Sequence, residues 1–291
     1  INNLTKVYGS VVAVNNVSFT VEPKSIFGIL GPNGSGKTTT LGIILDVIKA
    51  NSGVYSWFGG TAHTKAVKQK VGAILETPNF YPYLTGRQNL KIVSDIKGVS
   101  YGKIDATLSK VGLLARGNSK FKDYSLGMKQ RLAIASTLIG DPEVLILDEP
   151  TNGLDPEGII QIRELIKSIA AEGKTIILAS HLLDEVEKVC THVGILKSGN
   201  MLKYGSVEEI LSDDALFEIS AEDLDALIKG LDNLDYTKIL ETKKNSVIIK
   251  ASDEKITAQY LNKYLFDKGI ILTHLVAKKK SLEEQFLEIV K

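Results

Sequence analysis

Short apolar runs alternate along the chain with segments whose apolar residues recur at helical spacing. Apolar runs of the length of a buried strand lie within 25–30, 71–76, 143–149 and 175–180. Helical periodicity covers 37–49, 156–172 and 182–190, and residues 192–202 have the pattern of a hairpin. Strands that alternate with helices in this way predict an α/β fold built on a parallel sheet.

A block of helices interrupts this alternation between about 84 and 140. Thr85 and Gln88 are three residues apart and form a capping-box pattern, which marks a helix N-terminus. Further helices are predicted over 102–113 and 126–139. We therefore expect a helical subdomain at 84–140 within a larger domain that spans 1–210.

The pattern changes after residues 206–214, where glycine becomes sparse and the motifs described below stop. The remaining segments follow the order strand, helix, strand, strand, helix, strand, with a last helix at 281–290. We predict the first six at 215–220, 222–230, 236–241, 246–251, 254–268 and 270–277. This order is typical of a small ferredoxin-like α+β domain, which we expect to occupy 211–291.

Composition excludes several classes of protein. The 291 residues include 35 Lys and Arg and 34 Asp and Glu, so a nucleic-acid binder that works mainly by charge is not expected. No apolar run approaches the roughly 20 residues that span a bilayer. Cys190 is the single cysteine, which excludes an internal disulfide and a multi-cysteine zinc site. It precedes an apolar segment, so we interpret it as a buried structural thiol.

A glycine-rich loop follows the apolar run 25–30 and matches the pattern G-x-x-x-x-G-K-[ST]. Glycines let backbone N–H groups turn inward around phosphates, and the helix that follows points its positive end at the same anion. Lys37 supplies a positive charge to the phosphates, and Thr38 offers a hydroxyl to Mg²⁺. The alternative is a glycine turn with a surface lysine. The phosphate-binding candidates are Gly31, Pro32, Asn33, Gly34, Ser35, Gly36, Lys37, Thr38 and Thr39.

Polar residues also follow two other predicted strands. Asp148 and Glu149 end the run 143–149, and His181 follows 175–180. Ligands gather at the carboxyl ends of strands in open α/β sheets, so we expect these groups beside the loop. Asp148 suits the metal shell, Glu149 suits a general base for an attacking water, and His181 suits a hydrogen bond to phosphate or water. The alternatives are a strand-end acidic pair and a structural histidine.

The segment Tyr124-Ser-Leu-Gly-Met-Lys-Gln-Arg131, together with LILDEPTNGLDP at 145–156 and Ser180-His181, resembles the motifs of ATP-binding-cassette (ABC) ATPases over roughly 1–210. The resemblance implies a P-loop ABC ATPase domain with antiparallel β and helical subdomains. It also implies ATP and Mg²⁺ as ligands and a homodimer that sandwiches two ATP molecules, where Ser125 and Gly127 of one chain complete the site of the other. A separate membrane permease is implied as partner, with the chain on the inner, cytoplasmic face of the membrane.

The resemblance assigns further positions. Tyr8 matches the aromatic residue that stacks on adenine, and Asp155 matches a loop that crosses the dimer interface; simple packing and a helix N-cap are the alternatives. Glu76 stands where the family has a metal-binding glutamine, and Met128 replaces the glutamine of the signature. Both departures resemble exporters of the bacitracin and lantibiotic self-protection branch. We expect Glu76 to make hydrolysis more dependent on Mg²⁺ than a glutamine would.

The main prediction is therefore an ATP-hydrolysing subunit that energises an exporter. The alternatives are a soluble ABC ATPase in translation or DNA maintenance, and an ATP sensor without turnover. The loop 78–84 carries three aromatic residues beside the helical subdomain and is expected to dock on the permease, unless its rings pack internally.

Overall fold

The computed structural model describes residues 1–61, 64–75, 79–211, 215–232, 234–253, 255–278 and 282–290. The chain separates into two compact units, Ile1–Gly205 and Ser206–Lys291. Each unit contains its own sheet and its own buried apolar cluster, so each is described by itself.

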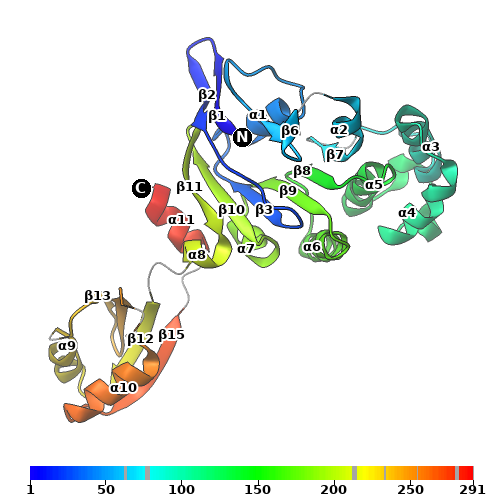
Figure 1. Ribbon diagram of the computed structural model, residues 1–291. Coiled ribbons are helices and arrows are strands. Elements are labelled where there is room, and N and C mark those ends of the chain that lie inside the picture. The colour runs from blue at the N-terminus through cyan, green and yellow to red at the C-terminus, as the bar shows by residue number, and fades with distance from the viewer. Residues whose placement is uncertain are drawn as a thin grey trace. The chain divides into compact units, whose positions relative to one another are not determined.

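A six-stranded sheet forms the centre of the first unit (Figure 1). Its strands are β3 (Ile26–Leu30), β7 (Val71–Ile74), β8 (Val144–Asp148), β9 (Thr175–Ser180), β10 (His192–Lys197) and β11 (Asn200–Ser206). They lie in the order β11-β10-β3-β9-β8-β7, and every pair from β10 to β7 is parallel. All residues of β3 and β8 are buried, as continuous apolar runs predict, and the α/β architecture is confirmed.

A second, three-stranded sheet packs against this core. It contains β1 (Asn2–Tyr8), β2 (Val11–Val17) and β4 (Ser52–Val54), with a small hairpin of β5 (Ser56–Trp57) and β6 (Gly60–Thr61) following. Leu4 and Val14 of this sheet belong to the same buried cluster as Phe27 and Leu41. This shared cluster holds the β1–β2 hairpin beside the loop that follows β3.

Seven helices are described in the first unit: α1 (Lys37–Ile44), α2 (Lys65–Gln69), α3 (Gly86–Lys97), α4 (Ile104–Lys110), α5 (Leu126–Leu138), α6 (Pro156–Ala171) and α7 (Leu183–Val189). Short 3-10 turns are η1 (Tyr101–Lys103), η2 (Leu114–Arg116) and η3 (Phe121–Asp123). The helices α3, α4 and α5 contact one another and form the helical part at one end of the unit (Figure 1). The predicted capping box is confirmed, because Thr85 and Gln88 exchange both side-chain hydrogen bonds.

Helix ends are where the sequence prediction was wrong. The helix predicted over 37–49 ends at Ile44, because Asp46 adopts a positive φ of 61° and the chain turns back. Backbone N–H groups of Val47 and Ile48 then donate to the carbonyl of Gly42. An added Cβ at Gly42 would lie 2.7 Å from the Ile48 side chain. The glycine therefore leaves room for Ile48, which the helical pattern had placed inside the helix.

The second unit has one four-stranded antiparallel sheet in the order β13-β14-β12-β15. Its elements are α8 (Val207–Leu211), β12 (Ala215–Ala221), α9 (Leu224–Asp232), β13 (Thr237–Thr242), β14 (Val247–Ala251), α10 (Ala258–Asp267), β15 (Leu272–Lys278) and α11 (Leu282–Val290). From β12 to β15 this is the ferredoxin-like order that the sequence predicts. Thr257 caps α10 by accepting from the Tyr260 N–H, so this helix begins later than the predicted residue 254.

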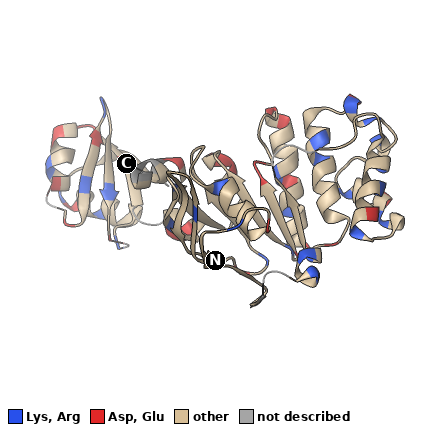
Figure 2. Cartoon of the chain, turned by 90° about the horizontal axis from the view of Figure 1, so that it is seen from above, with Lys and Arg blue, Asp and Glu red and all other residues tan. Residues whose placement is uncertain are grey.

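Charge is mixed throughout the molecule. Figure 2 shows Lys and Arg interspersed with Asp and Glu in both units, in keeping with the net charge of +1. Among the described residues, no helix is both long enough and apolar enough to span a bilayer. The structure confirms that Cys190 is buried, at 8% exposure.

Candidate nucleotide-binding site

The glycine-rich loop joins the end of β3 to the start of α1. Gly36 is the N-cap of α1 with φ of 105°, and no side chain caps this end of the helix. An added Cβ at Gly36 would lie 2.4 Å from the Ala13 carbonyl oxygen, and one at Gly31 would lie 2.3 Å from that of Leu196. Glycine is therefore required where the loop passes β2 and β10. The first N–H groups of α1 are left to an anion at the loop.

Lys37 is buried at the base of this loop, with 6% exposure. Its Nζ donates to the carbonyl oxygens of Gly31 at 2.8 Å and Pro32 at 3.3 Å. Nζ also lies 3.5 Å from Oε1 of Glu149. A lysine is rarely buried unless it is paired, so these contacts hold a positive charge beneath the loop. The reading of Lys37 as a surface lysine is excluded.

The rest of the loop presents two kinds of surface. Pro32, Asn33, Gly34 and Thr38 are exposed, and Thr39 is half-buried. Ser35 is 2% exposed, and in the described part of the chain its hydroxyl has no hydrogen-bond partner. A buried hydroxyl without a partner costs about 1–3 kcal/mol of stability, and a phosphate oxygen that accepts a hydrogen bond from it can offset this cost.

Glu149 connects the loop to the neighbouring strands. It directly follows β8 and has a positive φ of 48°, a backbone conformation that non-glycine residues seldom adopt and that is associated with functional sites. Its backbone N–H donates to the carbonyl of Ala179 on β9. Its Oε2 lies 2.8 Å from Nδ1 of His181, which follows β9. The carboxylate thus bridges Lys37 and His181, and the three residues meet at the carboxyl ends of β3, β8 and β9.

The metal candidates differ in their surroundings. Asp148 is buried at 3% exposure at the end of β8, and Thr38 is exposed in the first turn of α1. Glu76 lies outside the described residues, so its assignment stays a prediction. Within the described ranges, no group of three or more His, Cys, Asp and Glu side chains is arranged to hold a metal. A protein magnesium site needs only one or two such ligands, because water and substrate phosphates supply the others.

Tyr8 lies at the end of β1, beside the turn of the β1–β2 hairpin. Its ring is 47% exposed, and Nζ of Lys6 lies 4.8 Å from the ring centroid. The ring is not packed internally, so it is accessible to a planar ligand. The same hairpin contributes Ala13, whose carbonyl abuts Gly36 of the loop.

A separate hollow of about 450 Å³ contains the remaining candidates. Ser125, Gly127 and Asp155 line it, together with Arg131 and Glu157. None of its lining residues comes from the loop 31–39. The loop 31–39 and the hollow at Ser125 are thus separate parts of the predicted site on one chain.

The two caps at this hollow confirm the structural readings of these residues. Ser125 Oγ accepts from the Met128 N–H at 3.3 Å, and Asp155 Oδ1 accepts from the Gly158 N–H at 2.9 Å. These bonds position the N-termini of α5 and α6 at the hollow. A second role for either side chain in nucleotide contact stays a prediction.

Sequence reasoning missed Arg131 and Asn89. Arg131 Nη1 donates to the carbonyls of Val111 and Gly112 at 3.4 Å each, and among the described residues its buried Nε has no partner. Arg131 is the last residue of the motif that begins at Tyr124, and that position is the signal that could have identified it. No comparable signal singled out Asn89, because a helical asparagine normally faces solvent.

Asn89 fixes the aromatic loop. It is 1% exposed; its Oδ1 accepts from the Tyr81 N–H at 2.9 Å, and its Nδ2 donates to the carbonyls of Tyr81 and Thr85. Phe80 packs edge-on against Phe121, with ring centroids 5.2 Å apart. Tyr81 and Tyr83 are 62% and 75% exposed. One ring therefore packs internally and two face solvent.

Comparison with known proteins identifies similar chains. The family model described as ABC transporter matches residues 14–152. The chain is 38% identical to the uncharacterized ABC transporter ATP-binding protein YhcH of Bacillus subtilis, over 99% of this chain and 94% of that protein. It is 37% identical to the bacitracin transport ATP-binding protein BcrA of Bacillus licheniformis, over 99% and 95%. The lantibiotic transport ATP-binding protein SrtF of Streptococcus pyogenes is 40% identical, over 75% and 97%.

Solved structures are similar over about seven-tenths of the chain. An ATP-binding subunit of an ABC transporter matches with a TM-score of 0.64 and 28% identity, covering 72% of this chain and 90% of that one. A dimeric, post-hydrolysis ATP-binding cassette bound to ADP and Pi matches with a TM-score of 0.64 and 26% identity, covering 71% and 97%.

Proposed function

The chain belongs to the ABC transporter family as an ATP-binding and ATP-hydrolysing subunit, and from this premise we propose that it energises the export of a peptide antibiotic of the bacitracin or lantibiotic class. Relatives named for bacitracin and lantibiotic transport support this cargo class. The reading as a soluble ATPase in translation or DNA maintenance is not favoured, because the relatives are named as transporter ATP-binding proteins, and YhcH and the Bacillus licheniformis BcrA match this chain almost end to end.

The contacts of Glu149 are the observation that supports the catalytic assignment best. Lys37 holds the loop and offers its charge to the phosphates, while Glu149 accepts a proton from the attacking water. His181 holds the Glu149 carboxylate through Nδ1, leaving its other ring nitrogen available to the phosphate or the water. The positive φ at Glu149 is a strained backbone conformation of the kind that clusters at functional sites.

Mg²⁺ fits the residues at the end of β8 and the start of α1. Asp148 and Thr38 would hold it, with Glu76 as a further ligand expected from the sequence. When bound, the ion would offset the negative charge of the phosphates. The buried Ser35 hydroxyl and the uncapped N-terminus of α1 supply further hydrogen-bond donors for the phosphates.

A homodimer would unite the two separate halves of the site. None of the described residues that line the hollow at Ser125 belongs to the loop 31–39, so a second chain could bring its own loop to the N-terminus of α5. In a sandwich of two chains, Ser125 and Gly127 of one face the ATP held by Lys37 of the other. The dimeric cassette among the structural relatives supports this arrangement.

The permease would dock on the helical part of the first unit, at the inner face of the membrane. Tyr81 and Tyr83 are exposed beside α3, and Asn89 anchors their loop through hydrogen bonds with the Tyr81 backbone. Exposed rings on a fixed loop are characteristic of interaction surfaces.

Resistance measurements test the cargo. The chain would be expressed with its neighbouring permease in a host sensitive to bacitracin and lantibiotics, with the Glu149→Gln variant as the inactive control. We expect resistance to one of these peptides with the native chain and none with the variant. Equal sensitivity of both strains to every peptide would reject the cargo class, while ATP hydrolysis by the purified chain would still stand.

A further inference from the structure

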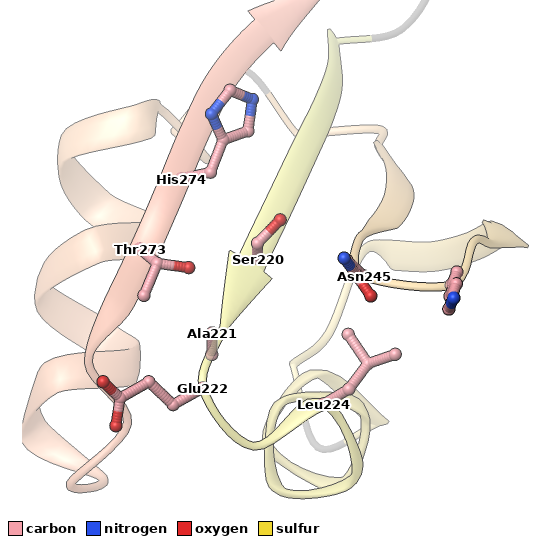
Figure 3. A pocket seen from close by; sticks show the side chains of 8 residues that line it. Ser220, Ala221, Glu222, Leu224, Asn245, Thr273 and His274 are labelled. Atoms are coloured by element: carbon pink, nitrogen blue, oxygen red, sulfur yellow. The ribbon is translucent and has the colours of Figure 1, made fainter.

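A hollow of about 410 Å³ lies at one end of the sheet in the second unit, within the usual size range of small-molecule sites. Three segments line it: the end of β12 with the turn into α9, the turn between β13 and β14, and the start of β15 (Figure 3). Its polar lining residues are Ser220, Glu222, Lys244, Asn245, Thr273 and His274. None of them belongs to the nucleotide machinery described above.

The turn that forms one wall is fixed in place. Lys243 and Ser246 flank Lys244 and Asn245, and the Lys243 N–H donates to the Ser246 carbonyl. Both flanking side chains also contact Glu218 on β12: Ser246 Oγ donates at 2.9 Å, and Lys243 Nζ lies 3.5 Å away. The turn that carries Lys244 and Asn245 is therefore anchored on both sides, and both residues are exposed.

Glu218 remains ionised over the physiological range. Lys278 Nζ lies 2.5 Å from its Oε2. The hydrogen bonds from Lys278 and Ser246 lower the pKa of Glu218 to about 2. Glu218, which anchors the turn, thus keeps its negative charge, and Lys243 and Lys278 both form ion pairs with it.

The polar side chains that line the hollow have no partners within the described part of the protein. Within the residues that the structure describes, none of the six polar side chains makes a hydrogen bond or an ion pair with the protein. In Figure 3, Asn245 and Leu224 point into the space beside β12, and Ser220 lies between Asn245 and His274. Two hydroxyls, an amide and an imidazole thus surround the hollow without partners of their own.

The charges have a definite arrangement. Lys244 neighbours Asn245 in the β13–β14 turn, whereas Glu222 lies in the turn after β12. Figure 3 shows Glu222 and Asn245 on opposite sides of Ala221. A simple anion would meet the Glu222 carboxylate, and a simple cation would meet the Lys244 ammonium. A ligand with both charges is complementary to both.

We propose that this hollow binds a small zwitterion, a free amino acid or a dipeptide, with its carboxylate toward Lys244 and Asn245 and its ammonium toward Glu222. Ser220 supplies a hydrogen bond near the carboxylate, and Thr273 on β15 supplies one on the Glu222 side. Leu224 and Ala221 give the apolar surface for a small side chain. The proposal is independent of the cargo, because it concerns only the second unit.

Calorimetric titration of the full chain tests it. The probes are the twenty L-amino acids one at a time, L-alanyl-L-alanine, and two half-ligands, propionate and ethylamine. We expect at least one zwitterion to bind with Kd below about 1 mM, and both half-ligands to bind at least about ten-fold more weakly. Binding should also shift the methyl resonances of Ala221 and Leu224 in the same full chain. An amino acid and the dipeptide are distinguished by which of them binds more tightly.

Variants connect the binding to the hollow. Glu222→Gln and Lys244→Gln should each weaken the zwitterion about ten-fold or more, which corresponds to about 1.4 kcal/mol. Asp267→Asn and Lys263→Gln on α10 are matched controls and should leave Kd unchanged. The proposal is overturned if no zwitterion binds, if propionate binds as tightly as the best zwitterion, or if the two lining variants bind like the controls.

Discussion

At the scale of single residues, the Glu149 carboxylate is the central group of the proposed hydrolysis. It contacts Lys37 on one side and His181 on the other, and its backbone has a positive φ. A glutamine in its place keeps the shape but does not accept a proton from water.

We predict that Glu149→Gln lowers the rate of ATP hydrolysis by about 100-fold or more, the range in which general bases contribute, while ATP binding persists. Hydrolysis would be measured by phosphate release and binding by nucleotide titration. Glu143→Gln is the matched control, because Glu143 precedes the same strand at its opposite end and pairs with Lys70. Equal rates for the Glu149 and Glu143 variants would remove Glu149 from the general-base role.

Cys190 provides a second test at this scale. Burial raises the pKa of its thiol, so the reactive thiolate should not form as the pH rises from 7 to 9. We predict that a thiol reagent labels the native chain at least about ten-fold more slowly than glutathione across this range. Labelling in denaturant serves as the control and should be fast. Native labelling at the rate of glutathione would show that the thiol is accessible.

At the scale of elements, Asn89 couples α3 to the aromatic loop. Its side chain makes hydrogen bonds at both Oδ1 and Nδ2 while it is almost fully buried. Removing it leaves the backbone of Tyr81 and Thr85 without these partners.

We predict that Asn89→Ala lowers the free energy of unfolding by about 1–3 kcal/mol and weakens stimulation of ATP hydrolysis by the permease. The basal ATPase rate of the isolated chain should change little, because Asn89 lies outside the nucleotide site. Stability would be measured by denaturant unfolding and stimulation in membranes. Lys91→Gln, exposed on the same helix, is the control. Full stimulation of the Asn89 variant would mean that the loop does not transmit the permease signal.

Element types could be predicted from the sequence, whereas several ends could not. The continuous apolar runs of β3 and β8 and the capping box at Thr85 identify their elements by local chemistry alone. The end of α1 depends instead on Ile48 packing back against Gly42, a tertiary contact that periodicity does not contain. Asn89 was missed for the same reason, because its partners belong to a loop that folds over the helix.

At the scale of the whole molecule, the nucleotide candidates all lie in the first unit. The second unit has its own sheet and buried cluster. A chain that ends at Gly205 should therefore keep basal ATP hydrolysis within about two- to three-fold of the full chain, because distant and independent parts of a protein usually make nearly additive contributions. Circular dichroism would confirm that the shortened chain is folded. Loss of all activity in a folded truncation would show that the second unit supports catalysis.

The site itself could be predicted only in part. Lys37, Glu149 and His181 could be predicted from sequence motifs, because each motif follows a buried strand. The carboxyl ends of these strands meet at one edge of the sheet. The hollow at Ser125 and Asp155 could not be predicted in this way, since the N-termini of two separate helices form it. We propose that a second chain faces that hollow in the working protein.

The most direct test of the central claim is the mass of the Glu149→Gln variant in solution with and without ATP and Mg²⁺, measured by light scattering. Slow hydrolysis in this variant should preserve the bound nucleotide between two chains. We predict a mass of one chain, 31.6 kDa, without nucleotide and twice that mass with it. Adding Ser125→Arg should restore the single-chain mass, because a long charged side chain would block the partner's ATP. A single-chain mass at saturating ATP and Mg²⁺ would contradict the shared site.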